Sequence, residues 1–239
     1  MTGDLTRPPA WAGTEAPNPG LSRYHPEMIL LLRGLLLLAT SALALAVCAW
    51  AWTLTSRPFV WFDGVLSPEG VEALRPSHWL TWGHAAICTL FLLTSLVCRR
   101  YGVGAALVHV LLSVIWVVGA ATAMSLEFVH VNPGTVLQPS VREAVALLLA
   151  LTAGQVSSVF VFEHTRGVEW WNAPAYAALT ATLVSMPLFY AMAYAGQDWI
   201  WLNRMSIDVA LKVVTAFVLL VPYFVLRPLV RPREGMGGY

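Results

Sequence analysis

The sequence predicts an all-α membrane protein with six transmembrane helices and both termini in the cytoplasm. Three observations support this fold class: six long apolar runs, few charged residues and an uneven distribution of arginine. Each run is close to the ~20 residues that an α-helix needs to cross a bilayer. The runs are Leu35–Trp52, Trp79–Cys98, Gly104–Leu126, Val141–Phe162, Pro174–Gly196 and Ile207–Leu226.

Composition agrees with a protein whose solvent is lipid. Hydrophobic residues make up 58% of the chain and charged residues 11%, against roughly 25% charged in soluble domains. A net charge of +1 argues against nucleic-acid binding, which needs a basic face. The three cysteines fall inside apolar runs without ligand spacing, so we expect neither a metal site nor a disulfide framework. No cofactor is expected either.

The chain divides into a Pro/Gly-rich tail (1–27), a six-helix transmembrane domain (28–230) and a C-terminal tail (231–239). The first 27 residues contain five prolines and three glycines, which oppose helix formation. They show no small-residue cleavage pattern before the first apolar run, so we interpret them as a retained cytoplasmic tail. The excess of arginine over lysine, with abundant Ala, Trp and Pro, fits a bacterial genome rich in G and C. We expect the chain to lie in the bacterial inner (cytoplasmic) membrane as a multi-pass protein.

Arginine sets the predicted orientation, because positively charged residues concentrate on the cytoplasmic side. With both termini inside, the cytoplasmic segments carry twice as many arginines as the external loops. Arg33, near the inner end of the first helix, can extend to the same side. The cytoplasmic arginines are Arg7, Arg23, Arg99, Arg100, Arg166, Arg227, Arg231 and Arg233; the external ones are Arg57, Arg75, Arg142 and Arg204.

The first external loop, Thr53–His78, is the long one. Within it Ser67, Pro68 and Glu69 have the pattern of a helix N-terminus: a capping hydroxyl, a proline and an acid in the first turn. The loop therefore predicts one or two turns of interfacial helix. Tryptophans around it are typical of an aromatic belt at the membrane surface.

Polar residues inside the runs are few and mark candidate functional positions. His84 and His109 stand alone in the second and third helices, where a helix-to-helix hydrogen bond is the alternative to ligand binding. In the fifth helix, Pro187 frees a backbone carbonyl. Lys212, the only lysine, has Asp208 one turn earlier, so structural pairing and solute contact both stay open. The other polar groups, which can line a cavity or join helices, are Gln155, Ser158, Thr182, Ser185 and Tyr190.

Nothing in the sequence indicates an enzyme. The chain lacks a glycine-rich phosphate loop, a GxSxG motif, an HExxH motif and a carboxylate pair inside the membrane. No catalytic residue is therefore assigned.

Four segments in order resemble the bacterial family of vitamin-uptake-type and queuosine-precursor transporters. They are Phe91–Gly102, Gly154–Phe162, Leu188–Gly196 and the Leu211-Lys-Val-Val segment followed by Pro222. The resemblance covers about Trp79 to Val230. It implies a substrate site formed by Ser95, Gln155, Ser158, Ser185, Tyr190 and Lys212.

The chain departs from the family pattern at its acids. Ser95, Ser158 and Ser185 stand where the family carries aspartates, and Arg99-Arg100 replaces its glutamate position. A cationic or nitrogen-rich base would lose charge-assisted hydrogen bonds in such a site. The resemblance therefore implies an altered, neutral or anionic solute.

Two functions of different classes follow. The first is a transporter of a small solute of the vitamin or nucleobase-precursor class, with the lipid bilayer and that solute as its partners. The second is a non-transporting integral subunit of a larger membrane complex, for example an energy-transducing or photosynthetic one, whose partners are other membrane-protein subunits. The sequence leaves both open.

Overall fold

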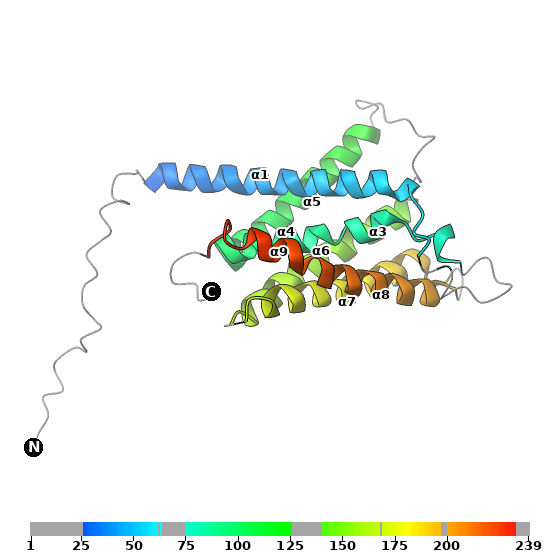
Figure 1. The fold of residues 1–239 in the computed structure, drawn as a ribbon. Helices are drawn as coiled ribbons and strands as arrows, with labels where there is room; N and C mark the ends of the chain where they lie inside the picture. Colours follow the sequence, from blue (N-terminus) through cyan, green and yellow to red (C-terminus); the bar gives the residue numbers. More distant parts are fainter. Residues whose placement is uncertain are drawn as a thin grey trace, which may run out of the picture. The chain divides into compact units, whose positions relative to one another are not determined.

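A computed structural model describes residues 26–61, 63, 75–125, 140–167, 169–196 and 200–232. These residues are helical, apart from short turns and one isolated bridge between Pro58 and Thr81. The elements, shown in Figure 1, are α1 (Pro26–Thr53), η2 (Leu54–Ser56), η4 (Pro76–His78), α3 (Trp82–Ala86), α4 (Thr89–Tyr101), α5 (Val103–Ser125), α6 (Val141–His164), α7 (Asn172–Tyr194), α8 (Trp201–Val218) and α9 (Leu220–Leu226).

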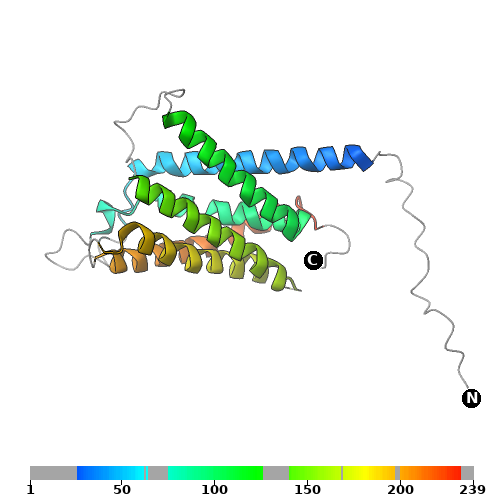
Figure 2. The same ribbon diagram turned by 180° about the vertical axis from the view of Figure 1, so that it is seen from behind.

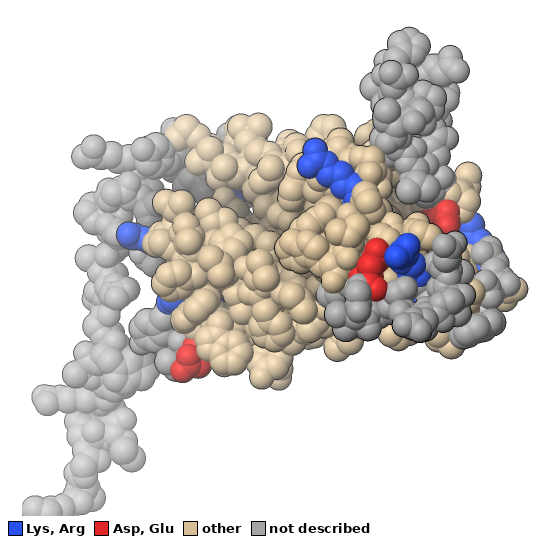
Figure 3. Space-filling model, turned by 45° about the vertical axis from the view of Figure 1, so that its right-hand side comes forward, with Lys and Arg blue, Asp and Glu red and all other residues tan. Residues whose placement is uncertain are grey.

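Six stretches of the described residues are long and apolar enough to cross a membrane, which confirms the predicted number of spans. The surface between the few charged side chains is broad and uncharged (Figure 3), as a lipid-facing surface requires. The six stretches are Leu30–Ser56, Trp82–Tyr101, Val103–Ala123, Val141–His164, Asn172–Tyr194 and Trp201–Leu226.

Two of the six spans are built from two helices each, where the apolar runs predict continuous ones. The second span breaks after α3, at Ile87 and Cys88, before α4 begins at Thr89. The sixth breaks at Leu219, between α8 and α9, and Pro222 follows in the first turn of α9. By contrast, α7 continues through Pro187.

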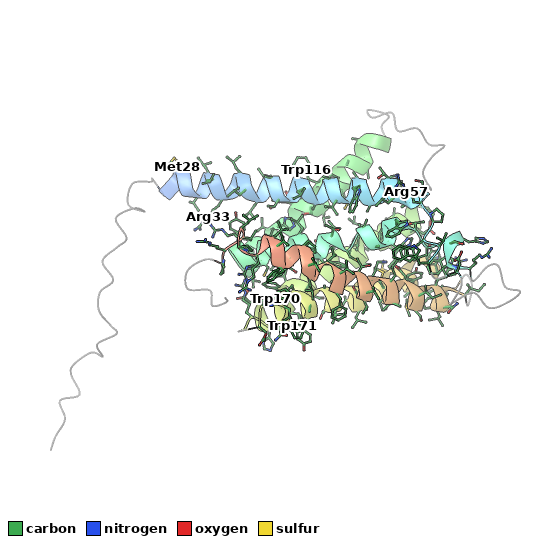
Figure 4. The ribbon with its side chains drawn as sticks, viewed as in Figure 1. Met28, Arg33, Arg57, Trp116, Trp170 and Trp171 are labelled. Carbon is green, nitrogen blue, oxygen red and sulfur yellow. The ribbon has the colours of Figure 1, made fainter. Side chains whose placement is uncertain are left out.

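The chain separates into two units, residues 1–36 and 37–239. In the first unit the described residues, 26–36, form the start of α1. The second unit contains the remainder of α1, where Ser41, Ala44 and Ala51 are buried. Ser41 accepts a hydrogen bond from the indole of Trp116 in α5 (3.1 Å), whose position is labelled in Figure 4.

The closest helix pair in the second unit is α6 with α7, which lie side by side in both ribbon views (Figures 1 and 2). Gly154 permits this approach, because a Cβ atom there would lie 2.8 Å from the carbonyl oxygen of Ala181. Small residues at such contacts are the usual means of close packing in membranes. α4 lies against both helices and against α5, to which it is joined through Gly102 (φ 84°).

The helix ends are held by local contacts. Ser140 and Glu143 form a reciprocal capping box at the start of α6. At the start of α7, the Trp170 ring lies 5.0 Å from that of Phe224, and Trp171 follows it (Figure 4). The interfacial turn predicted at Ser67–Glu69, most of the N-terminal tail and most of the C-terminal tail lie outside the described residues.

Candidate functional site

Two broken spans face each other along one seam inside the second unit. On the α3–α4 side the seam presents His84, Cys88, Ser95 and Arg99, which recur at intervals of three or four residues and multiples of them. On the α8–α9 side it presents Asp208, Lys212, Ala216 and Tyr223, all of them buried. Helical spacing places each set on one face of its span. We call this arrangement the seam.

At one end of the seam Asp208 and Lys212 form an ion pair one helical turn apart. Their side chains are 1% and 3% exposed, so the pair is inside the helix bundle. The second carboxylate oxygen of Asp208 accepts a hydrogen bond from Tyr190 of α7 (3.3 Å). Burial without such partners would be costly for either charge. The pair is therefore the electrostatic centre of this end, which we call the Asp208 end.

His84 of α3 completes the Asp208 end. Its Nδ1 atom accepts the backbone N–H of Thr81 (3.2 Å) and lies 3.0 Å from the Thr81 hydroxyl. Since Nδ1 is an acceptor, the neutral ring carries its proton on Nε2. The imidazole lies near enough to interact electrostatically with both Asp208 and Lys212.

A small pocket lies along the seam beyond the ion pair, at the level of both helix breaks. Cys88 comes from the break between α3 and α4, and Leu219 from the break between α8 and α9. Ser95 contributes a hydroxyl to the lining, and α7 closes the side. The lining residues are Cys88, Phe91, Leu92, Ser95, Pro174, Ala178, Ala216, Leu219, Leu220 and Tyr223.

The opposite end of the seam is closed by arginine. Arg99 hydrogen-bonds the Tyr223 hydroxyl and donates from Nε to the backbone oxygen of Val230 (3.0 Å). Arg100 donates to the next carbonyl, that of Arg231 (3.0 Å). Arg166, which pairs with Glu163, bonds the carbonyl of Cys98 at the end of α4. These contacts join the ends of α4, α6 and α9, at what we call the Arg99 end.

A second polar group lies beside the seam, between α4, α6 and α7. The Thr94 hydroxyl donates to the side-chain oxygen of Gln155 (3.0 Å), and Ser158 donates to the Gln155 backbone oxygen (2.7 Å). The hydroxyls of Thr182 and Ser185 are buried and have no hydrogen-bond partner among the described residues. Ser185 packs directly against Gly154.

The six predicted site residues therefore fall into separate places. Ser95 lines the pocket. Tyr190 and Lys212 meet through Asp208 at one end of the seam, and Gln155 and Ser158 adjoin each other on α6. Ser185 lies in the contact between α6 and α7. Whether they bind a solute stays a prediction.

Sequence reasoning named His84 and Asp208 but missed Arg99 and Tyr223 as parts of the seam, and it missed Thr94 as the partner of Gln155. The signal that could have identified the seam is a set of buried polar residues at helical spacing on each of two different spans. A single sequence does not state which spans are neighbours, so the match becomes visible only when the two helices lie together.

Comparison with known proteins assigns the chain to a family. The model of the family described as "putative vitamin uptake transporter" matches residues 81–226, more than half of the chain and the whole seam from His84 to Tyr223. The chain belongs to this family. Membership confirms the resemblance in the four segments, and the putative vitamin uptake transporter family is not an enzyme family.

Together with the six apolar spans, membership makes the protein a multi-pass membrane protein of a transporter family. No curated protein and no solved structure matches the chain. Among the described residues, no group of three or more His, Cys, Asp or Glu side chains is placed to hold a metal ion.

Proposed function

We propose that this protein moves a small organic solute, uncharged or anionic, across a bacterial inner membrane by alternating access along the seam. The observation that carries the proposal is the position of the pocket. It lies where both spans are broken, with a polar cluster closing the seam at each end. Broken helices that meet near the middle of a bundle are typical of substrate sites in secondary transporters.

The two ends of the seam supply two gates. Opening the Asp208 end requires the ion pair to move away from Tyr190 of α7. Opening the Arg99 end requires Arg99 to release Tyr223 and the carbonyl of Val230. The first break can absorb such bending because its backbone bonds partly follow the looser i→i−3 pattern, from Cys88 to Ala85 and from Phe91 to Cys88. The second can bend because Pro222 has no backbone N–H to donate. The structure with both clusters formed corresponds to an occluded state.

The pocket lining supports an altered solute of the vitamin or nucleobase-precursor class. Its side-chain polar atoms come from Cys88, Ser95 and Tyr223, and none of the lining residues is an acid. A cationic solute would therefore meet no counter-charge there, whereas a neutral heterocycle could hydrogen-bond the hydroxyls. Arginine distribution assigns the Arg99 end to the cytoplasm under this proposal.

Uptake into proteoliposomes tests the proposal. The full-length protein would be offered a panel of radiolabelled solutes: nicotinamide, nicotinate, pantothenate, biotin and the common nucleobases. We expect uptake of at least one, and its loss in Ser95→Trp, which fills the pocket. The matched control is Leu111→Trp on α5, a position with 61% exposure to the lipid side, which should leave uptake intact.

A non-transporting subunit of a larger complex is the second candidate function. The observation that favours it is at Ser185, whose side chain packs against Gly154 instead of lining the pocket. Purification in a mild detergent separates the two. A stable stoichiometric complex with other membrane proteins, combined with no uptake of any panel solute, would establish the subunit role and overturn transport.

A further inference from the structure

The Asp208–Lys212 pair is electrically neutral and stands directly beside the pocket. Lys212 is one turn from Ala216 of the pocket lining, and it interacts electrostatically with Cys88, another lining residue. Asp208 is one turn farther away, toward the Asp208 end. Any change in the charge of Asp208 therefore determines whether the Lys212 ammonium is neutralised within the protein or needs a partner from the pocket.

Asp208 is surrounded by titratable and charged groups from every element packed against it. Lys212 and Arg204 lie on its own helix, one turn to either side. The groups from the neighbouring elements are His84 of α3, Cys88 at the start of α4, Tyr190 and Tyr194 of α7, and, beyond Tyr194, Glu143 of α6.

A row of hydroxyl and carboxyl groups runs from the end of the bundle toward Asp208, with a gap in the hydrogen bonding between Tyr194 and Tyr190. Glu143 at the start of α6 accepts a hydrogen bond from Tyr194 (2.6 Å). The rings of Tyr194 and Tyr190 are 5.7 Å apart, and Tyr190 donates to Asp208. A proton moving along the row would need one tyrosine hydroxyl to rotate, since Tyr194 donates to Glu143 and Tyr190 donates to Asp208. The row reaches the buried carboxylate without crossing the pocket.

We infer that Asp208 binds a coupling proton and that Lys212, released by it, receives the acidic group of the solute in the pocket. This inference rests on the proposed transport function. The proton arrives from water at the Asp208 end and converts the carboxylate into a neutral carboxyl. The Lys212 ammonium then has no anionic partner on α8, and the solute carboxylate supplies one. When the site opens to the opposite side of the membrane, Asp208 loses the proton and pairs with Lys212 again. The re-formed ion pair displaces the anion.

The charge of the site is zero in both the closed state and the loaded state of this cycle. The closed state holds Asp208⁻ and Lys212⁺, and the loaded state holds neutral Asp208, Lys212⁺ and the anion. Solute and proton therefore cross together without net charge, as an anion–proton symport. A metal ion does not fit the same position, because the Lys212 ammonium would repel it and, among the described residues, Asp208 is the one carboxylate that pairs with Lys212.

The thiol of Cys88 reports this event without knowledge of the solute. Two methanethiosulfonate reagents of similar size would be used, one carrying a sulfonate and one a trimethylammonium group. Both transfer an alkylthio group to the thiolate and release methanesulfinate. Peptide mapping distinguishes Cys88 from Cys48 and Cys98, the other free cysteines. The variant is Asp208→Asn, which imitates the protonated carboxyl.

In full-length protein reconstituted in liposomes, we expect Asp208→Asn to raise the rate of the anionic reagent at Cys88 by at least ~10-fold, as local electrostatic attraction allows. The cationic reagent should gain much less. The double variant Asp208→Asn/Lys212→Met should lose the preference. Equal rates for the two reagents in the single variant, or rates as slow as in the unmodified protein, would overturn the inference.

A second measurement tests the effect of pH. In the unmodified protein, the ratio of the anionic to the cationic rate would be followed from pH 8 to pH 5. The ratio cancels the ionisation of the thiol, because both reagents attack the same thiolate. We expect the ratio to rise as the pH falls, and to rise less in Asp208→Asn, whose remaining pH dependence belongs to His84. A constant ratio in the unmodified protein, or the same rise in Asp208→Asn, would contradict a proton on Asp208.

The two proposals fail in different ways. If an uncharged solute is taken up and the reagent ratio stays constant with pH, the proposed transport function holds. The inference of a coupling proton on Asp208 and an anion on Lys212 is then wrong. If Cys88 reacts preferentially with the anionic reagent but no solute is taken up, the anion site at Lys212 holds. The proposed transport function is then wrong. Transport by symport requires both results and, in addition, uptake of nicotinate or another panel carboxylate that increases with external acidity.

Discussion

A Cβ atom placed on Gly154 would lie 2.9 Å from the Cβ atom of Ser185. The two residues belong to α6 and α7, the closest helix pair of the described structure. A contact this close leaves no space for a side chain at Gly154. Ser185 therefore packs in the contact between the two helices, although the resemblance to the family implies that it contacts the solute.

Gly154→Ala should therefore destabilise the protein although alanine is the better helix former. Overpacking of a tight contact costs about 1–3 kcal/mol, and the new methyl group would meet the Ala181 carbonyl oxygen at 2.8 Å. The control is Gly119→Ala on α5, where nothing lies within 4 Å of the added atom. It should be neutral or stabilising. Thermal unfolding in detergent measures both, and equal shifts would contradict the tight contact.

Restored aspartates should differ according to position. Ser95→Asp places a carboxyl on the lining of a pocket with room for about one water molecule, and should lower the amount of protein in the membrane only moderately. Ser185→Asp places a carboxyl against Gly154 and should lower that amount strongly, because a buried unpaired charge is not tolerated. Quantitative immunoblots of membranes compare the two. Equal tolerance would place both serines in one solvated cavity.

Uptake of a cationic or guanine-like queuosine precursor by the unmodified protein is not expected. The three serines at the family's acid positions remove the charge-assisted hydrogen bonds that such a base would use. Cells without their own precursor uptake, expressing this protein, should not accumulate queuosine in tRNA. Regained uptake in Ser95→Asp would indicate a degenerate precursor site, and robust uptake by the unmodified protein would show that the serines do not exclude the base.

Removing one partner of the buried ion pair should cost more than removing both. Asp208→Leu or Lys212→Met alone leaves an uncompensated buried charge, which typically costs about 3–5 kcal/mol. The double variant has an apolar pair in the same place and should recover most of the loss. A double-mutant cycle of unfolding free energies measures the coupling. Additive losses would mean that the two groups are solvated separately.

Reporter fusions test the orientation. A fusion after Arg100, at the Arg99 end, should fluoresce when the reporter is green fluorescent protein, which folds in the cytoplasm. A fusion after Gly196, at the other end of α7, should be active when the reporter is alkaline phosphatase, which folds outside. The reverse pattern would invert the topology inferred from arginine.

Much of this protein is determined by its sequence alone. The six spans follow from run length, because a chain in lipid must satisfy its backbone hydrogen bonds within each segment. The pairing of Asp208 with Lys212 was one of two open interpretations, and local spacing is sufficient for it, since residues four apart on a helix are neighbours. Family membership follows from the order of four segments between His84 and Tyr223.

Only the tertiary structure decided which residues of different spans contact one another. Arg99 meets Tyr223, Thr94 meets Gln155, and Ser185 meets Gly154, each across a long separation in the chain. The break at Cys88 also became apparent only in three dimensions, because it lies in an apolar run whose composition is that of a continuous helix, whereas Pro222 marks the break at Leu219 in the sequence. In lipid, apolar side chains have little preference for one helix neighbour over another, so hydrophobic pattern does not specify the arrangement. Close contacts of small residues and a few buried hydrogen bonds do, and these exist only once the helices are packed.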